Sequence, residues 1–197
     1  MFGNECEFYS KSFKNGEIVS GIISKIVFES CSFDRCDFNG SSFDSCEFID
    51  CKFTNCNLNL LKIPNCKFES TQFLECKMMA IDWSKAYWRG LNLGFPLEFK
   101  SCLLSSSSFF SLNLTKMTME SCKSHDVDFR EGRFSRSNFF GTDFQGSLFQ
   151  NTDLTHVNFE NAINYDINII KNKVKNAKFD RFEAVRLLEV LGIKLVG

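Results

Sequence analysis

Residues 31–55 read CSFDR-CDFNG-SSFDS-CEFID-CKFTN, five consecutive copies of a five-residue unit. Each copy begins with Cys or Ser and has Phe in third place, and its other positions are mostly polar. The same frame extends outward, because large apolar residues recur at five-residue steps from Phe8 to Leu93 and from Phe99 to Phe179. The phase slips by one residue across positions 94–98. Ser124 and Asn164 are polar exceptions, which we interpret as tolerated packing defects.

The two most unusual residue types in the composition, Phe and Cys, each favour one position of the five-residue unit. Nineteen of the 24 Phe residues occupy the third position, and all ten Cys residues occupy the first. A period of five fits neither an α-helix nor an ordinary strand, so we expect the first and third residues to point inward and the others outward. Such a unit can repeat only by winding into coils that stack at about 4.8 Å and pair their backbone amides. The sequence therefore predicts an all-β solenoid.

The chain divides into two predicted parts. Residues 1–179 form the solenoid, with the register break at 94–98, and residues 180–197 leave the repeat. Asp180 can cap a helix, and Gly192 can end it. Apolar residues at three-residue steps give this helix one face, and a short apolar strand is expected over 193–196. The predicted dimer interface of this segment consists of Phe182, Val185, Leu188, Leu191, Ile193 and Leu195.

These features resemble the pentapeptide-repeat family, whose fold is a right-handed quadrilateral β-helix with four repeats in each coil. The stretches Cys76–Trp83, Ala162–Tyr165 and Leu187–Gly197 are similar to members that protect topoisomerases from albicidin, microcin or quinolones. The resemblance implies a tail-to-tail homodimer that binds DNA gyrase or topoisomerase IV by imitating DNA. Which poison is countered is left open.

Four repeats per coil would place the repeats centred on residues 8, 28, 48, 68 and 88 on one face. The candidate topoisomerase-facing acidic stripe on that face is Glu7, Glu29, Glu47, Asp50 and Glu69. A net charge of −1 cannot match duplex DNA, which carries about one charge per 1.7 Å, so any imitation must be local. Lys52, Lys62, Lys67 and Lys77 are then expected to turn away or to be tolerated. The alternative is that these acids only keep a solenoid soluble.

The sequence offers little for catalysis. It has two His residues, cysteine spacings unlike those of zinc sites, no phosphate-binding loop, and no His placed to activate the serines at 105–108. Buried thiols are expected to act as small apolar residues. We expect no enzymatic activity, no cofactor and no metal. The basic run Lys171, Lys173, Lys175 and Lys178 is interpreted as a solvated face, so no direct nucleic-acid partner is expected.

The start of the sequence has no secretory signal pattern, and no stretch of 18 apolar residues occurs. We therefore expect a cytoplasmic protein without a membrane partner, whose thiols stay reduced. Two hypotheses remain for its function. One is a non-enzymatic protector of DNA gyrase or topoisomerase IV, and the other is a protein-interaction scaffold without topoisomerase affinity, since fold alone does not determine function.

Overall fold

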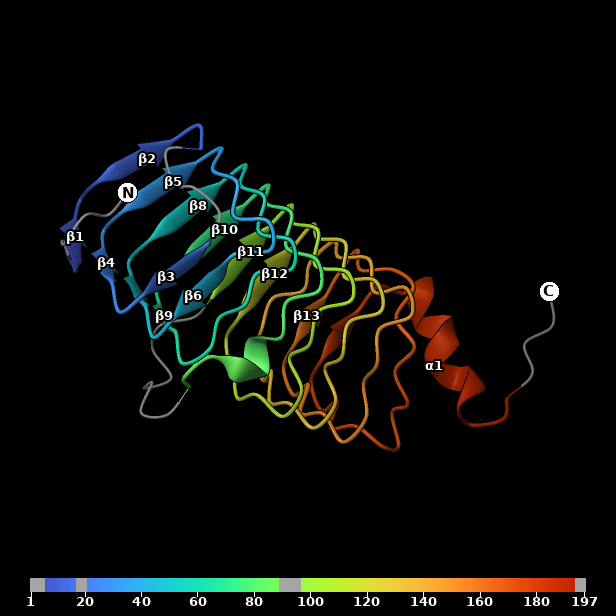
Figure 1. Ribbon diagram of the computed structural model, residues 1–197. Helices are drawn as coiled ribbons and strands as arrows, with labels where there is room; N and C mark the ends of the chain where they lie inside the picture. Colours follow the sequence, from blue (N-terminus) through green and yellow to red (C-terminus); the bar gives the residue numbers. More distant parts are fainter. Residues whose placement is uncertain (1–5, 17–20, 89–96, 194–197) are drawn as a thin grey trace.

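The computed structural model describes residues 6–16, 21–88 and 97–193. The chain winds into coils that stack along one axis, and a short helical segment follows the last coil (Figure 1). Strands of successive coils pair in parallel, usually with a step of twenty residues, as in the series Phe8, Phe28 and Phe48. The expected all-β, quadrilateral β-helix is confirmed. No helix among the described residues is long and apolar enough to cross a membrane.

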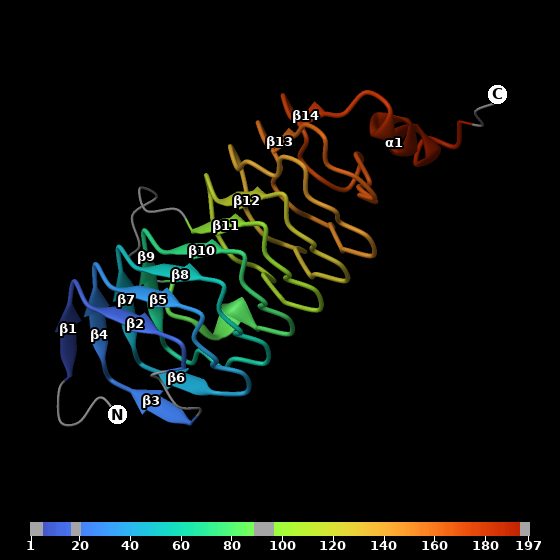
Figure 2. The same cartoon turned by 90° about the horizontal axis from the view of Figure 1, so that it is seen from above.

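The coils have four faces, which we number in chain order. Face 1 begins as a four-stranded sheet, whose strands lie side by side in Figure 2: β1 (Glu7–Tyr9), β4 (Val27–Glu29), β7 (Glu47–Ile49) and β9 (Lys67–Glu69). Face 2 is a longer sheet of β2 (Ser12–Lys14), β5 (Ser32–Asp34), β8 (Lys52–Thr54), β10 (Gln72–Leu74), β11 (Glu98–Lys100) and β12 (Thr118–Glu120), followed by β13 (Asn158–Phe159) and β14 (Lys178–Phe179).

The other two faces are held mainly by isolated parallel bridges. Face 3 runs through Asp37, Asn57, Lys77, Leu103, Lys123 and Asp143. Face 4 starts with β3 (Ile22–Ser24) and β6 (Ser42–Asp44) and continues through Asp82, Ser108, Asp128 and Leu148. The C-terminal part of face 1 is joined in the same way, through Asn113, Arg133, Asp153 and Lys173.

Each change of face is a corner with a left-handed backbone. The residue two places after the central position has a φ near +55° in almost every described repeat, as at Ser30, Arg35 and Asn55. Ser and Asn are frequent at these corners, and Asn tolerates this region better than most residues. The corner residue turns the chain toward the next face. Because each five-residue unit supplies one face and one corner, four units complete a four-sided coil.

The interior consists of stacked aromatic rings. On face 1 the rings of Phe28 and Phe48 lie 5.1 Å apart with an interplanar angle of 8°. On face 2 the rings of Phe33 and Phe53 lie 4.4 Å apart at 10°. Rings on neighbouring faces meet edge to face, as Phe28 and Phe33 do at 76°. Both geometries suit the quadrupole of an aromatic ring, so the central column packs well along and across the axis.

In many repeats the first position of the unit holds a small side chain that hydrogen-bonds to the backbone. Cys51 Sγ donates to the carbonyl oxygen of Phe28 at 3.3 Å, and Thr71 Oγ1 donates in the same way to Phe48 at 3.1 Å. Burial raises the pKa of the Cys51 thiol to about 12. The cysteines are therefore weak hydrogen-bond donors as well as small apolar groups, which explains why Ser and Thr share their column.

One coil is longer than the others. Gln72 pairs with Lys52 on one side, a step of 20 residues, and with Glu98 on the other, a step of 26. Before the extra residues, the Trp88 ring still stacks near Phe68, 6.4 Å away, and after them Leu97 is buried in register. The six extra residues therefore fall between Trp88 and Leu97, and Leu93 and most of the expected break at 94–98 lie outside the described residues. In the sequence these six residues appear only as a one-residue slip in phase, because five of them make up one whole repeat period.

The last coil departs from the expected register. Asn164 is not a central residue, because it is half-buried with a φ of +57°, while Tyr165 is fully buried and Ile167 pairs with Phe149. The interpretation of Asn164 as a packing defect was therefore wrong. Ser124, by contrast, is fully buried and donates to Met119 Sδ at 2.9 Å.

The helical segment at the end is short. It comprises a 3₁₀ turn, Glu183–Val185, and α1, Arg186–Glu189. Asp180 Oδ1 accepts hydrogen bonds from the backbone nitrogens of Phe182 and Glu183, just before the 3₁₀ turn, and Gly192 has a φ of +71° three residues after α1 ends. Most of the strand expected over 193–196 lies outside the described residues.

Candidate functional site

The structure brings the five predicted acidic residues together on face 1. In the four-stranded sheet, Glu7 and Glu47 share one column, with Val27 between them. Glu29 and Glu69 share the neighbouring column, with Ile49 between them. Asp50 occupies the corner that follows β7. We call this surface, Glu7, Glu29, Glu47, Asp50 and Glu69, the acidic half of face 1.

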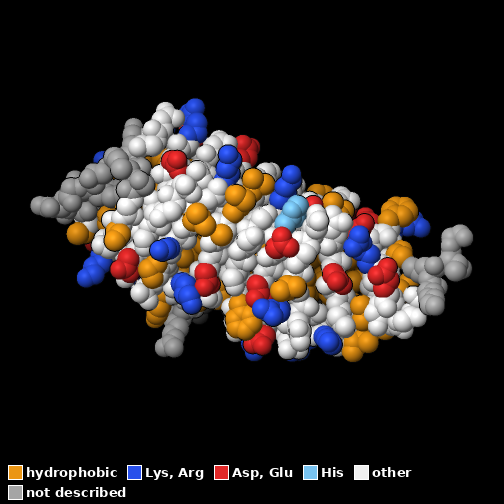
Figure 3. Space-filling view, turned by 45° about the vertical axis from the view of Figure 1, so that its right-hand side comes forward, with side chains coloured by type: hydrophobic (Ala, Val, Ile, Leu, Met, Phe, Trp, Pro, Cys, Tyr) orange, Lys and Arg blue, Asp and Glu red, His pale blue; other side chains and the backbone are white. Residues whose placement is uncertain are grey.

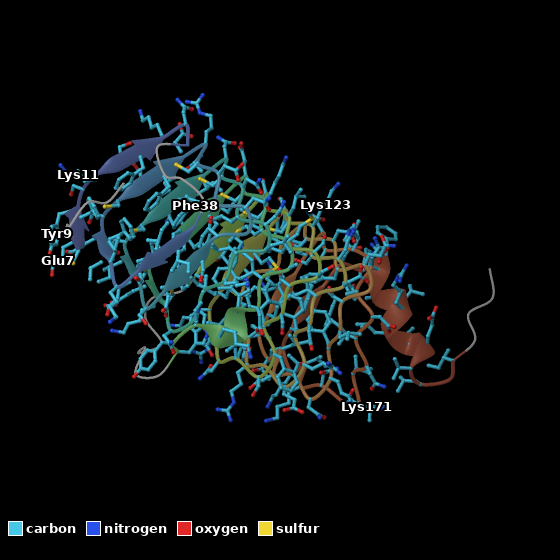
Figure 4. All side chains as sticks on the ribbon, viewed as in Figure 1. Glu7, Tyr9, Lys11, Phe38, Lys123 and Lys171 are labelled. Atoms are coloured by element: carbon cyan, nitrogen blue, oxygen red, sulfur yellow. The ribbon has the colours of Figure 1, made fainter. Side chains whose placement is uncertain are left out.

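These carboxylates point outward while the Phe column points inward. Glu7, Glu29 and Asp50 are exposed, and Glu47 and Glu69 are partly buried by their neighbours. Figure 4 shows Glu7 and Tyr9 projecting from the first coil, whereas Phe38 lies in the interior. The Tyr9 hydroxyl donates to Glu7 Oε2 at 2.7 Å, which adds a polar contact to the outer edge of the acidic half.

The four lysines that were expected to turn away or to be tolerated divide between these two outcomes. Lys67 does not turn away from the acidic half, because it follows Glu47 in the same column and its Nζ lies 2.5 Å from Glu47 Oε1. The two side chains lie at the surface with exposed fractions of 42% and 34%, and surface ion pairs contribute little to stability. Lys52, Lys62 and Lys77 lie on faces 2, 4 and 3, so their charges do point away from the acidic half.

The basic run near the C-terminus is divided among three faces. Lys173 and Lys175 lie on face 1, and Lys178 lies in β14 on face 2. Lys171 lies near the corner that follows face 4, at the C-terminal end of the stack (Figure 4). The run is therefore not one patch. Its two members on face 1 join cations from earlier coils, which the spacing within the run could not reveal.

The predicted dimer residues are largely exposed. The exposed fractions of Phe182, Val185 and Leu191 are 77%, 42% and 48%, and Ile193 is 46% exposed. Leu188 is partly buried, and Leu195 lies outside the described residues. Leu187, which the sequence had not singled out, is instead the residue that packs on the solenoid, with 8% exposed. The capping contact and the outward apolar residues thus belong to different sides of the segment.

A polar network, missed in the sequence, ties face 3 to the helical segment. His125 Nε2 lies 2.8 Å from Asp143 Oδ2, and Asn164 Nδ2 donates to Asp143 Oδ1 at 2.9 Å. The backbone nitrogen of Asn164 donates to Glu183 Oε2, which also pairs with Arg186 at 3.1 Å. These residues come from three coils and the segment after them. Their contacts depend on the altered register at Asn164, which a strict period of five does not predict.

The described parts of the chain contain no group of three His, Cys, Asp or Glu side chains that could hold a metal ion. The buried thiols are arranged in columns along the axis, with backbone carbonyls as acceptors. We therefore take the charged side chains of face 1 as the candidate functional site.

The fold and its outward charges define an elongated β-solenoid built from five-residue units. The family model described as pentapeptide repeat region matches residues 26–94, and the model described as pentapeptide repeats (8 copies) matches residues 125–163. Together the two matches cover more than half of the chain. The chain belongs to the pentapeptide-repeat proteins.

Solved structures with a similar fold include two trypsin-treated forms of QnrB1, described as a plasmid-mediated fluoroquinolone resistance protein. The first is 19% identical in sequence, with a TM-score of 0.63, and the match covers 98% of both chains. The second is 20% identical, with a TM-score of 0.55, over 98% of this chain and all of the other. The structural similarity shows a shared fold and, at this low sequence identity, no more than that. No curated protein sequence matches the chain.

Proposed function

We propose that this protein binds DNA gyrase or topoisomerase IV and protects the enzyme from poisons, with the acidic half of face 1 standing in for a short segment of DNA. The observation that carries the proposal is the collection of five carboxylates on one regular sheet and its corner at the N-terminal end of the solenoid. The resemblance of the sequence to topoisomerase-protecting members supports the same partner. So does the fold shared with a fluoroquinolone resistance protein.

The local charge density is of the right order for such imitation. The four coils of the acidic half span roughly 14 Å, a length over which duplex DNA carries about eight phosphates on its two strands. A protein that contacts one side of the duplex meets about half of these. The acidic half offers five carboxylates and one Lys in the same length. The imitation is therefore confined to this half, since the whole chain has a net charge of −1.

We propose a homodimer formed through the C-terminal segment. Phe182, Val185 and Leu191 are exposed apolar residues on a segment whose inner side already packs on the solenoid through Leu187. A second copy is the occupant that the resemblance implies. Association end to end would double the length of the rod and place one acidic half at each end.

The test is a DNA-cleavage assay with purified gyrase, a fluoroquinolone and increasing amounts of this protein, run in parallel with topoisomerase IV and with albicidin. The wild-type protein is expected to suppress poison-dependent cleavage. A variant carrying Glu29→Lys, Glu47→Lys and Glu69→Lys is expected to need roughly tenfold more protein for the same effect, because charge complementarity is reversed.

The matched control carries Glu75→Lys, Glu120→Lys and Glu160→Lys on face 2, which changes the net charge equally. It is expected to protect as the wild type does. If the wild-type protein suppresses DNA cleavage with none of these poisons, the result contradicts the proposal and favours the scaffold hypothesis. Equal loss in the test and control variants would show that net charge matters and the acidic half does not.

A further inference from the structure

The C-terminal half of face 1 carries the opposite charge from its N-terminal half. The outward cations of the coils centred on Leu114, Phe134, Leu154 and Val174 are Lys116, Arg133, Arg136, Lys173 and Lys175. All five are exposed, and His156 lies among them. We call this surface the basic half of face 1. On the side of the molecule drawn in Figure 3, by contrast, acidic and basic side chains are interspersed.

The cations of the basic half are held in a regular array. Parallel bridges place Arg133, Asp153 and Lys173 in one column, so their backbones are separated by about 4.8 Å per coil. The corner residues Lys116 and Arg136 form a second column at the edge of the face. The array is rigid, because each backbone is hydrogen-bonded to the coils before and after it, as in the bond from Lys116 N to Ser135 O at 3.0 Å.

These cations are not neutralised within the described part of the chain. None of the five forms an ion pair there, whereas Arg35, Lys67, Lys100 and Arg130 on other surfaces do. The one carboxylate of the basic half is Asp153. Burial raises its pKa, but hydrogen bonds from Thr155 and the charges of Lys173 and Arg133 outweigh this and leave the pKa below its ordinary value. Asp153 thus stays ionised at neutral pH, and the cations still outnumber it by five to one.

The remaining outward groups of the basic half are short and polar. Thr115, Ser135 and Thr155 lie in a third column, and the Thr115 and Ser135 hydroxyls are 3.4 Å apart. With Asn113, Arg133, Arg136, Asp153, His156 and Lys175 they line a groove of about 480 Å³. Arg, Lys, Ser, Thr and Asn are the side chains that most often contact nucleic-acid phosphates.

We propose that the basic half of face 1 binds the phosphate backbone of duplex DNA. A duplex is favoured over single strands, because the outward residues described here include no Phe, Tyr or Trp on which unstacked bases could lie. It is also favoured over an acidic protein, since the surface offers no exposed apolar anchor of the kind that dominates protein interfaces. A rigid, regular array of charges matches a rigid, regular polyanion.

The inference goes beyond the proposed function and does not depend on it, because it rests only on the charges of the basic half. It also replaces the sequence-based expectation of no direct nucleic-acid partner. That expectation considered the run at 171–178 alone, without the cations of the earlier coils that share its face.

The experiment measures fluorescence anisotropy of a short labelled duplex as the full-length protein is added, with no topoisomerase present. Binding should be independent of sequence, with a dissociation constant of about 1–100 µM at physiological salt. The plot of log association constant against log salt should have a slope between about −2 and −4.5, because at most five cations contact phosphates. A variant with Arg133→Ala and Arg136→Ala should flatten the slope by about 2 and weaken binding roughly tenfold at low salt.

The matched control carries Lys77→Ala and Lys123→Ala, two exposed cations of face 3, and should bind as the wild type does. Thermal melting checks that each variant is folded. The proposal is overturned if the duplex does not bind at about 50 mM salt, or if the Arg133 and Arg136 variant binds no worse than the face 3 control. Tighter binding of a single strand than of the duplex would overturn it as well. None of these results depends on topoisomerase binding, so the two proposals fail separately.

Discussion

At the scale of the residue, Leu60 departs from the chemistry of its position. It is a corner residue with a φ of +57°, and 58% of it is exposed. A left-handed conformation costs about 1–2 kcal/mol for a residue with a Cβ, and Asn tolerates it better than Leu does. Leu60→Asn should therefore raise the free energy of unfolding by about 0.5–1 kcal/mol, measured by urea denaturation.

The reverse exchange at another corner provides the control. Asn65 also has a φ of +57° and is exposed, so Asn65→Leu should lower the free energy of unfolding by a similar amount. A lower free energy of unfolding for Leu60→Asn would contradict the claim that Leu60 is strained at this corner.

The contribution of the central ring stack to stability can also be tested by single substitutions. Phe129 is fully buried, and its ring stacks between Phe109 at 5.4 Å and Phe149 at 4.9 Å. Phe129→Ala should lower the free energy of unfolding by about 3–5 kcal/mol, because it leaves a cavity between two coils. Phe129→Leu should cost about 1 kcal/mol.

Phe110, on the surface of the same face and 39% exposed, is the comparison for Phe129. Phe110→Ala should change the free energy of unfolding by less than about 1 kcal/mol in the same urea experiment. Similar losses for Phe110→Ala and Phe129→Ala would contradict the role given to the ring stack.

At the scale of the element, the helical segment is joined to the coils through Asp143. Burial raises the pKa of this carboxyl, whereas hydrogen bonds from Asn164 and His125 lower it by more, so it lies below its ordinary value of 3.8. A carboxyl whose pKa is lower in the folded state than in the unfolded state stabilises the protein at any pH above its unfolded-state pKa. This contribution is lost as the pH falls through the folded-state pKa.

The free energy of unfolding should therefore fall as the pH drops below about 4, and Asp143→Asn should make this fall shallower. Urea denaturation at several pH values measures both. Asp166→Asn, which removes an exposed carboxylate from a neighbouring coil, is the control and should keep the wild-type pH dependence. Parallel curves for the wild type and Asp143→Asn would exclude a stabilising role for the network.

At the scale of the whole molecule, the association state tests the assignment of the C-terminal segment. A homodimer should show a mass of about twice the 22.7 kDa of the chain by light scattering after gel filtration. Val185→Glu combined with Leu191→Glu should yield the monomer mass, because charges would be buried in an apolar contact. A monomeric wild-type protein at micromolar concentration would contradict the dimer.

The sequence predicts those features of the structure that are determined within a single five-residue unit. The inward columns followed from the five-residue period, since each unit must bury the same two positions whatever its neighbours are. The corner conformation, the hydrogen bonds of the cysteines and the shift at Asn164 and Tyr165 did not follow. They depend on how one coil meets the next and on where the stack ends.

The charge pattern shows the same limit. The acidic half could be listed because its members recur at steps of about twenty residues, yet the place of Lys67 beside Glu47 was missed. Three of the five cations of the basic half, Lys116, Arg133 and Arg136, were missed, because residues 101–150 contain five Lys and Arg and five Asp and Glu and so have no net formal charge. A count of charged residues along the chain averages over all four faces. Only the register of the stacked coils shows that Arg133 and Arg136 lie on face 1, apart from the acidic residues near them in the sequence.

The most direct test of the account is the binding of the immobilised protein to the DNA-cleavage core of gyrase in the absence of DNA, measured by biolayer interferometry. We predict that the wild type binds, that the variant with Glu29→Lys, Glu47→Lys and Glu69→Lys does not, and that the face 2 control and the Arg133 and Arg136 variant still bind. Equal binding of the wild type and the acidic-half variant, or no binding by either, would contradict the claim that this surface takes the place of DNA.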